Sequence, residues 1–509
     1  RFLRLFPAAA PVAAYVGRLP EPLTGRVSAR ARLSGNRERP RVDLDVDATQ
    51  LTLGPYTLAR VTGDLGVYPG TFVLSNVEAH ANGGILRANG TVGQGGAIDL
   101  TLAGTNLTLA AIRPVASGVG PLNGHAEVNA QVLGTLKAPQ VKGSLEIRDA
   151  SVGGMRFQHI SAQQVRISEG RLHLGRLVFT GGPIQGSVSG WMPFGWRPLG
   201  IPIGEPIQLS VLVPAQEVTL PPTPALGLTG ASAQVSGALA VGGTLQHPDL
   251  SGEVTIREGR ARFAMLENTF TGVNASLRMA GPAVIVEELT GKSDRGGGFR
   301  AWGTATLGDD GARVLDLAVT TGGGSGLELA FRNMGGVPGL HAAGAFHTTT
   351  RGAEAGAVTI TGPLRQPLIT GQLQLSRAQV AVPNEMRFRP RTRPLTVNPA
   401  LNLEVVTADG AAVRRGRGLS AVLTGSMVAR GTLQEPNVGG RVVVERGDLY
   451  YAGTHFRLQP GGTLSFSADP PAPLTTRLDV YALTRVRTRS QNTGERRLYN
   501  VTMHLSGTL

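Results

Sequence analysis

The sequence predicts an all-β protein, built as a long, curled antiparallel β-sheet with an apolar interior and almost no helix. Three observations support this fold class. The 509 residues include 71 glycines and 33 prolines, which would interrupt a helix every few turns. Apolar and polar residues alternate over most of the chain, and one sequence template recurs four times. Because 41% of the residues are hydrophobic, wholesale disorder is excluded.

The template begins with Gly and continues with Leu at +2, Pro at +5, an aliphatic residue at +7, a second Gly at +9, and aliphatic residues at +11 and +13. A degenerate copy begins at Gly35, and a further copy begins at Gly507. Such a recurrence predicts an array of similar multi-strand units. The four full copies begin at Gly134, Gly243, Gly362 and Gly431.

Each part of the template has a structural interpretation. We expect the Leu to end one strand and the residues up to Pro to form a tight turn, because Pro pre-sets its own φ. From +7 onward the aliphatic residues occupy alternate positions and therefore share one face of the next strand. The second Gly interrupts that aliphatic row, which predicts a bend or a close backbone approach.

Alternation continues between the copies. Asp43, Asp45 and Asp47 alternate with aliphatic residues, and polar residues alternate with apolar ones from Tyr499 to Leu505. Each such segment predicts a strand with one apolar and one polar face, and the chain has room for roughly 30–40 of them. We treat residues 1–509 as one continuous repeating β-groove, with approximate units 1–130, 131–240, 241–358, 359–428 and 429–509.

A sheet of this length with a single apolar face must curl to shield that face. Full closure would give a barrel too wide for side chains to fill, so we predict a half-closed trough. Aromatic residues are only 5% of the chain, and a trough lined by small aliphatic residues leaves space for a ligand. The candidate groove-lining residues are Leu145, Ile147, Val254, Ile256, Leu373, Leu375, Val442, Val444, Leu464, Phe466, Val501, Met503 and Leu505.

Several kinds of chemistry are excluded. The chain has no Cys, which removes disulfides, thiolate metal sites and Cys nucleophiles, and its nine His residues lack metal-ligand spacing. Asp43, Asp45 and Asp47 resemble the start of a calcium loop, but Ala48 and Gly54 occupy the positions that require Gly and Glu. We interpret the three carboxylates as the polar face of a strand. No nucleophile elbow occurs, so we predict no enzyme activity, catalytic residue, cofactor or metal.

The formal net charge is +14, but the basic residues are spread along the chain instead of alternating with aromatic ones. This distribution argues against a nucleic-acid partner. Two hypotheses remain for the densest group: a solvated strand face that deters edge pairing, or a contact with anionic lipid headgroups or an acidic partner. This group consists of Arg485, Arg487, Arg489, Arg496 and Arg497.

No stretch reaches the ~18 continuous apolar residues that a membrane span needs. The nearest, from Leu5 to Val16, is interrupted by Pro7 and Pro11. The chain has no initiator Met and no signal peptide pattern, and its last residues fall inside a copy of the template. We therefore interpret it as a fragment of a longer protein.

The repeats, and above all the last unit, resemble the TamB family, which is AsmA-like and contributes subunits to the translocation and assembly module. The resemblance is good from about Gly134 onward and loose before it. Its most specific segments, in order, are Gly447-Asp448-Leu449-Tyr450-Tyr451, His455-Phe456-Arg457-Leu458, Gly462-Thr463-Leu464-Ser465-Phe466, Leu478-Asp479-Val480-Tyr481-Ala482 and Val501 through Gly507-Thr508-Leu509.

The resemblance implies a β-taco fold with a hydrophobic groove, in a periplasmic protein that reaches the outer membrane. An N-terminal anchor outside this sequence would hold it in the inner membrane. One implied function is bridge-like transfer of phospholipids between the two membranes, in support of outer-membrane biogenesis. The alternative is an assembly factor that works with a TamA-like barrel partner to insert or secrete outer-membrane β-barrel proteins, lending a strand edge by β-augmentation.

Overall fold

The structure is a computed structural model. It describes residues 24–36, 39–53, 56–81, 83–93, 95–109, 122–152, 155–196, 199–223, 227–307, 313–322, 324–332, 338–349, 356–384, 397–433, 435–468, 475–489 and 496–508.

The described residues form β-strands and no α-helix, which confirms the predicted all-β class. Thirty strands belong to one mostly antiparallel sheet, and the short strands β12 (Gly195–Trp196) and β13 (Leu199–Gly200) pair with each other. No helix within the described ranges is long and apolar enough to cross a membrane. The chain divides into two compact units, each described below by itself.

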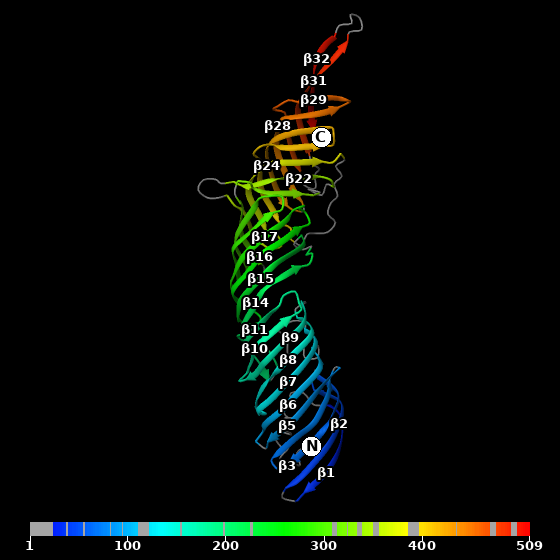
Figure 1. The fold of residues 1–509 in the computed structure, drawn as a ribbon, viewed down its shortest axis with the longest axis vertical. Helices are drawn as coiled ribbons and strands as arrows, with labels where there is room; N and C mark the ends of the chain where they lie inside the picture. Colours follow the sequence, from blue (N-terminus) through cyan, green and yellow to red (C-terminus); the bar gives the residue numbers. More distant parts are fainter. Residues whose placement is uncertain are drawn as a thin grey trace. The chain divides into compact units, whose positions relative to one another are not determined.

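The first unit comprises Arg1–Gln216 and Ser236–Gly252. Each strand from β1 to β10 pairs antiparallel with the next, and β11 then pairs with β14, so the unit is a simple meander (Figure 1, blue to cyan). Its strands are β1 (Thr24–Gly35), β2 (Pro40–Leu53), β3 (Tyr56–Tyr68), β4 (Thr71–Ala81), β5 (Gly84–Gly93), β6 (Ala97–Thr108), β7 (Leu122–Thr135), β8 (Ala138–Val152), β9 (Met155–Ser168), β10 (Arg171–Thr180) and β11 (Gly186–Pro193). Residues of both units occur in β14 (Gln208–Leu220), β15 (Leu228–Gly243) and β16 (Pro248–Phe263).

The second unit comprises Glu217–Val235 and Glu253–Leu509. Its strands are β17 (Thr269–Gly281), β18 (Ala283–Ser293), β19 (Gly298–Leu307), β20 (Arg313–Gly322), β21 (Leu327–Phe331), β22 (His341–Thr348), β23 (Val358–Pro363), β24 (Leu368–Val382), β25 (Ala400–Thr407), β26 (Ala411–Arg415), β27 (Leu419–Thr432), β28 (Pro436–Tyr451), β29 (Thr454–Leu458), β30 (Thr463–Ala468), β31 (Thr475–Arg489) and β32 (Arg496–Thr508).

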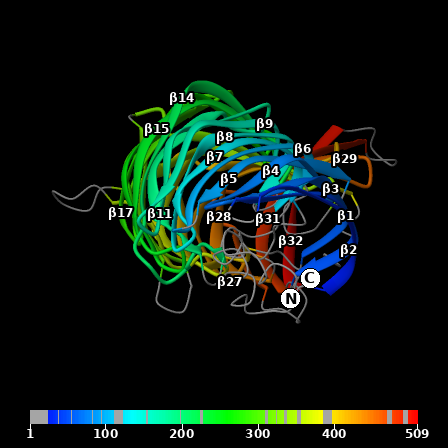
Figure 2. The same cartoon turned by 90° about the horizontal axis from the view of Figure 1, so that it is seen from below.

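The second unit departs from a simple meander first at β20, which pairs with β23, and again at β24. This strand pairs with both β22 and β23 on one side, and it pairs in parallel with β25 and β26 on the other. The sheet is therefore antiparallel except at these pairings. The last strands return to antiparallel pairing, with β29 and β30 both lying between β28 and β31. Seen end-on, the strands of each unit curve (Figure 2).

The repeated template forms a hairpin turn, but not at the positions predicted. Leu136 is already the first turn residue, and Pro139 lies in the next strand opposite Gly134. The Leu therefore does not end a strand, and in three of the four copies the Pro belongs to the next strand; in the fourth copy Pro367 directly precedes β24. The reason is the first Gly, whose positive φ starts the turn early. Its φ is 94°, 70°, 92° and 79° in the copies beginning at Gly134, Gly243, Gly362 and Gly431.

A threonine that the sequence interpretation overlooked closes three of these turns. Its Oγ1 accepts a hydrogen bond from the backbone N–H three residues later, at 3.2 Å for Thr135, 3.1 Å for Thr244 and 3.1 Å for Thr432. In the fourth copy Pro363 occupies this position, and its carbonyl accepts the equivalent bond from Gln366 at 2.9 Å. The template therefore encodes a side-chain-closed turn.

The second Gly of the template is required by close backbone approach, as predicted. A Cβ at Gly440 would lie 2.7 Å from the Ser426 carbonyl oxygen on the neighbouring strand. At Gly143 and Gly252 a Cβ would collide with the carbonyl oxygens of Asn129 and Ala238 in the same way. Only glycine fits where two strands approach this closely.

A β-bulge follows at position +15 of the template. The residue there has a φ of 50–53° in the copies beginning at Gly35, Gly134, Gly243 and Gly362, namely Gln50, Asp149, Glu258 and Arg377. A side chain on the neighbouring strand satisfies the backbone N–H in two of these bulges: Asn274 for Glu258, at 3.1 Å, and Asp409 for Arg377, at 3.0 Å. Before the bulge the core-face residues occupy odd positions of the template, and after it they occupy even positions. In the copy that begins at Gly134, Ala150 is therefore buried beside Ile147.

Candidate functional site

The face of each sheet that carries the buried clusters is called the core face, and the opposite one the outer face. In the first unit, one row of the core face crosses five neighbouring strands in register. It consists of Val42, Val67, Phe72, Val92 and Ile98, which are all at most 7% exposed. Such rows stabilise the sheet through cross-strand contacts.

Charge is strictly segregated in this unit. From β2 to β11, every Asp, Glu, Lys and Arg that has a register partner lies on the outer face. Several pair there across strands, such as Asp47 with Arg60 at 2.7 Å and Glu78 with Arg87 at 2.6 Å. The core face therefore forms a continuous apolar surface along the ladder.

The second unit has the same segregation with three exceptions. Among described residues with a register partner in β17–β32, the charged side chains on the core face are Arg313, Arg415 and Arg497. All three are arginines, all are exposed, and each lies at a strand end or near a hairpin tip. The interior of the core face is apolar, and its main cluster includes Val444, Phe456, Leu458, Val480 and Ala482.

The core face is not fully covered. Of its larger side chains, Met155 is 48% exposed, Val501 is 40% exposed and Leu33 is 73% exposed. Partly buried aliphatic residues such as Val132 and Leu145 surround the buried clusters. The result is a curved sheet with a one-sided apolar surface that a chain-like apolar ligand could contact.

The register places eleven of the thirteen predicted groove residues on the core face. The remaining two, Val254 and Ile256, are half-buried on β16. Ile147, Val442 and Val444 are buried, whereas Val501 is exposed. The predicted groove residues do not form one cluster. Leu145 and Ile147 belong to a cluster of the first unit. Val444, Leu464 and Met503 lie in or against a cluster of the second unit.

The predicted arginine group is divided between two faces. Arg485, Arg487 and Arg489 alternate along β31 on the outer face, and Arg496 lies opposite Arg489. Arg497 lies opposite Thr488, in the row that continues to Val501 and Met503 on the core face. A one-residue step along β32 therefore changes the side of the sheet.

The three aspartates of β2 lie on the outer face, as predicted. Asp47 accepts hydrogen bonds from Arg60, which lower the pKa of its carboxyl. Asp43 accepts a hydrogen bond from the Tyr68 hydroxyl at 3.0 Å, which raises the pKa of Tyr68. Within the described ranges no three His, Asp or Glu side chains come together in a way that could hold a metal ion.

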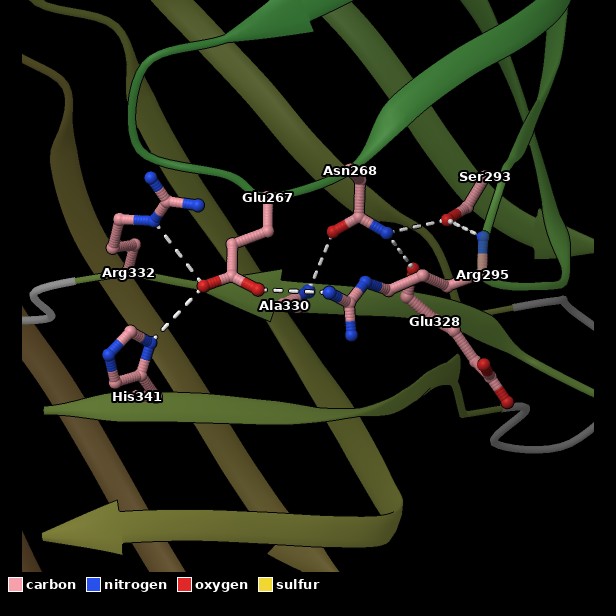
Figure 3. Close-up of polar contacts among 8 residues, drawn as sticks. All are labelled: Glu267, Asn268, Ser293, Arg295, Glu328, Ala330, Arg332 and His341. Carbon is pink, nitrogen blue, oxygen red and sulfur yellow. Dashed lines mark hydrogen bonds and ion pairs between the residues drawn. The ribbon is translucent and has the colours of Figure 1, made fainter.

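A polar cluster that the sequence did not indicate joins four chain segments of the second unit (Figure 3). Asn268 is 1% exposed; its Oδ1 accepts the Ala330 N–H at 2.7 Å, and its Nδ2 donates to the Ser293 Oγ at 2.7 Å and the Glu328 carbonyl at 3.0 Å. These bonds fasten β21 to the β18–β19 turn. No pattern in the sequence marks Asn268, because its partners are up to 62 residues away.

Glu267 lies beside Asn268 and binds three cationic or titratable side chains. Its carboxylate lies 2.9 Å from Arg295, 3.4 Å from Arg332 and 3.2 Å from the Nδ1 of His341. Burial raises the pKa of this carboxyl. Hydrogen bonds from His341 and Arg332, together with the charges of Arg332 and Arg295, more than offset that effect, so the pKa lies below its usual value.

The fold and the core face define a class of protein: a β-taco, in which the curved, mostly antiparallel sheet presents an apolar surface in each unit. The chain belongs to the TamB family, because the family model of the TamB C-terminal domain matches residues 75–284 and 344–509, more than half of the sequence. Comparison with curated proteins and with solved structures gave no match.

Family membership places the protein in the bacterial cell envelope. TamB-family proteins span the periplasm and take part in outer-membrane biogenesis through the translocation and assembly module, in which a TamA-like outer-membrane protein is the partner. Residues 285–343, which lie between the two matched segments, contribute Ser293, Arg295 and His341 to the polar cluster.

Proposed function

We propose that the protein is a bridge-like lipid transfer protein, which carries phospholipids between the inner and outer membranes along its apolar core face. The observation that supports this most is the charge segregation: across ten strands of the first unit, no described residue with a register partner places a charge on the core face. An ordinary β-sandwich would cover such a face with a second sheet.

The mechanism is passive and non-enzymatic. Each acyl methylene removed from water gains about 0.8 kcal/mol, so a chain lying on the core face remains shielded while the headgroup stays at the edge of the sheet. Successive strands offer equivalent apolar rows, so a lipid can move from row to row with little change in free energy. No cofactor, metal or catalytic residue is needed. We also propose that a further part of the protein anchors it in the inner membrane.

The test interrupts the path at β32 in the full-length protein. One variant replaces the core-face residues Val501, Met503 and Leu505 with Asp. The control replaces the outer-face residues Asn500, Thr502 and His504 with Asp, on the same strand. We expect the core-face variant to lose phospholipid transfer between the two membranes, and the control to keep it. Circular dichroism checks that both variants fold.

Wild-type transfer by a folded core-face variant would contradict the proposal. So would a folded wild-type protein that co-purifies without phospholipid when it is extracted from its own envelope and weighed by native mass spectrometry. The second result would favour the alternative role, in which the protein assists insertion or secretion of outer-membrane β-barrel proteins.

A further inference from the structure

The outer face of the last strands carries a row of polar side chains that the proposed lipid path does not use. Leu464 packs against the buried cluster of the second unit, so Ser465, one residue later on β30, points to the outer face. The register continues this row across the neighbouring strands, and we call it the arginine–hydroxyl row. Its members on β28, β30, β31 and β32 are, in order, Arg441, Ser465, Arg477 and Thr508.

A hollow of about 250 Å³ opens at this row. The Thr475 hydroxyl donates to the Ser467 backbone carbonyl at 3.1 Å. Within the described part of the chain, the hydroxyls of Ser465, Ser467 and Thr508 make no hydrogen bond, so all three are available to donate to a ligand. The lining consists of Ser465, Phe466, Ser467, Thr475, Arg477 and Thr508.

The two arginines of the row differ from many others on the outer face. Elsewhere an arginine often pairs with a carboxylate on the neighbouring strand, as Arg278 does with Glu287 at 2.8 Å. The residues directly opposite Arg441 and Arg477 are all Ser or Thr. Neither guanidinium makes an ion pair or a hydrogen bond with the residues that the structure describes, so both charges are available to an anion.

Acidic residues near the row do not neutralise it. Among the described residues that flank the two arginines along and across the strands, only Asp479, two residues after Arg477, is acidic. Its Oδ1 lies 2.8 Å from the Nε2 of His504, which is opposite Tyr481, so this contact holds the carboxylate on the side away from Arg477. Asp469 lies outside the described residues.

We propose that the arginine–hydroxyl row and its hollow form a binding site for a phosphate group, in which Arg477 makes the main contact. Two strand spacings, about 10 Å, separate the Cα atoms of Arg441 and Arg477, so two side chains of this length can reach one anion above Ser465. A guanidinium forms two parallel hydrogen bonds to phosphate oxygens, and hydroxyls donate further ones. The site lies on the face opposite the proposed lipid path and does not depend on it.

The test titrates the purified full-length protein by calorimetry in a phosphate-free buffer of low ionic strength. The probes are inorganic phosphate, glycerol 3-phosphate and uncharged glycerol. We expect both phosphates to bind and glycerol not to bind. Arg477→Gln should weaken both phosphates about tenfold, and Arg441→Gln and Ser465→Ala should each weaken them about threefold. Arg446→Gln removes the same charge from an exposed outer-face position of β28 outside the row, and should change neither affinity.

The two phosphate probes also distinguish the sources of the ligand. Tighter binding of glycerol 3-phosphate would indicate a phosphate ester, such as a lipid headgroup, whereas tighter binding of inorganic phosphate would indicate the free ion. Equal affinities would show that the phosphate group alone is recognised. A folded wild-type protein that binds neither probe would overturn the proposal. So would equal losses in Arg446→Gln and Arg477→Gln, which would indicate a general effect of charge, or an unchanged affinity in a folded Arg477→Gln variant.

Discussion

At the residue scale, Asn268 fastens two parts of the second unit that are distant in sequence. Its three hydrogen bonds are buried, and Asn268→Ala would leave the Ala330 N–H and the Glu328 carbonyl without this partner. We expect a loss of about 3 kcal/mol in the free energy of unfolding of this unit. Chemical denaturation measures it. The control Asn402→Ala, at an exposed position of β25, should change the stability by less than about 0.5 kcal/mol.

The carboxylate of Glu267, which lies beside Asn268, predicts that the stability of the fold depends on pH. The pKa of Glu267 is lower in the folded protein than its ordinary value of 4.5, so its ionised form stabilises the fold. That contribution is fully present above pH 4.5 and is lost as the pH falls through the folded pKa. Denaturation midpoints of the wild type and of Glu267→Gln should therefore differ at pH 7 and converge as the pH falls below 4.5 and through the folded pKa. A constant difference over this range would show that the charge of Glu267 plays no part.

At the element scale, the second glycine of the template sets how closely two strands approach. A methyl group at Gly440 would lie 2.7 Å from the Ser426 carbonyl and 2.9 Å from the Phe466 ring. We expect Gly440→Ala to destabilise the second unit by about 1–3 kcal/mol in denaturation experiments. Gly439→Ala is the matched control, because its nearest contact would be an ordinary 3.7 Å. Equal effects at the two positions would refute the steric explanation.

The template turn also makes a local prediction. Thr432→Val keeps the shape of the side chain but removes the oxygen that accepts the Glu435 N–H. Hydrogen exchange at Glu435 should become faster, by about tenfold if the bond contributes about 1.4 kcal/mol to the closed turn. Exchange in the middle of β28 should not change. Unaltered exchange at Glu435 would mean that the backbone alone closes the turn.

The elements also show what could be predicted from the sequence. Alternation predicted the strands and the outer-face position of Asp43, Asp45 and Asp47 correctly, because it depends only on neighbouring residues. The template correctly predicted that its second glycine lies where two strands approach closely. It did not predict the exact turn, because the positive φ of Gly134 makes Leu136 a turn residue. The division of the arginines between two faces required the register, and the partners of Asn268 required the long-range topology.

At the scale of the whole molecule, each unit is a ladder in which most strands contact only their immediate neighbours. Stability in such arrays is approximately the sum of neighbouring contacts. The apolar surface of each unit is therefore not a by-product of a compact core. It results from the repeated placement of aliphatic residues on one face, with charges on the other.

The central claim is that the core face holds acyl chains. It predicts that contacts with lipid alternate along each strand, with a period of two residues. The most direct measurement introduces a photo-crosslinking amino acid at each position from Ala126 to Leu133 of β7 in cells, and detects phosphate-labelled lipid bound to the protein. We expect adducts at the core-face positions Ala126, Val128, Ala130 and Val132, and none at Glu127, Asn129, Gln131 and Leu133. Adducts at the second set, or at neither, would contradict the account.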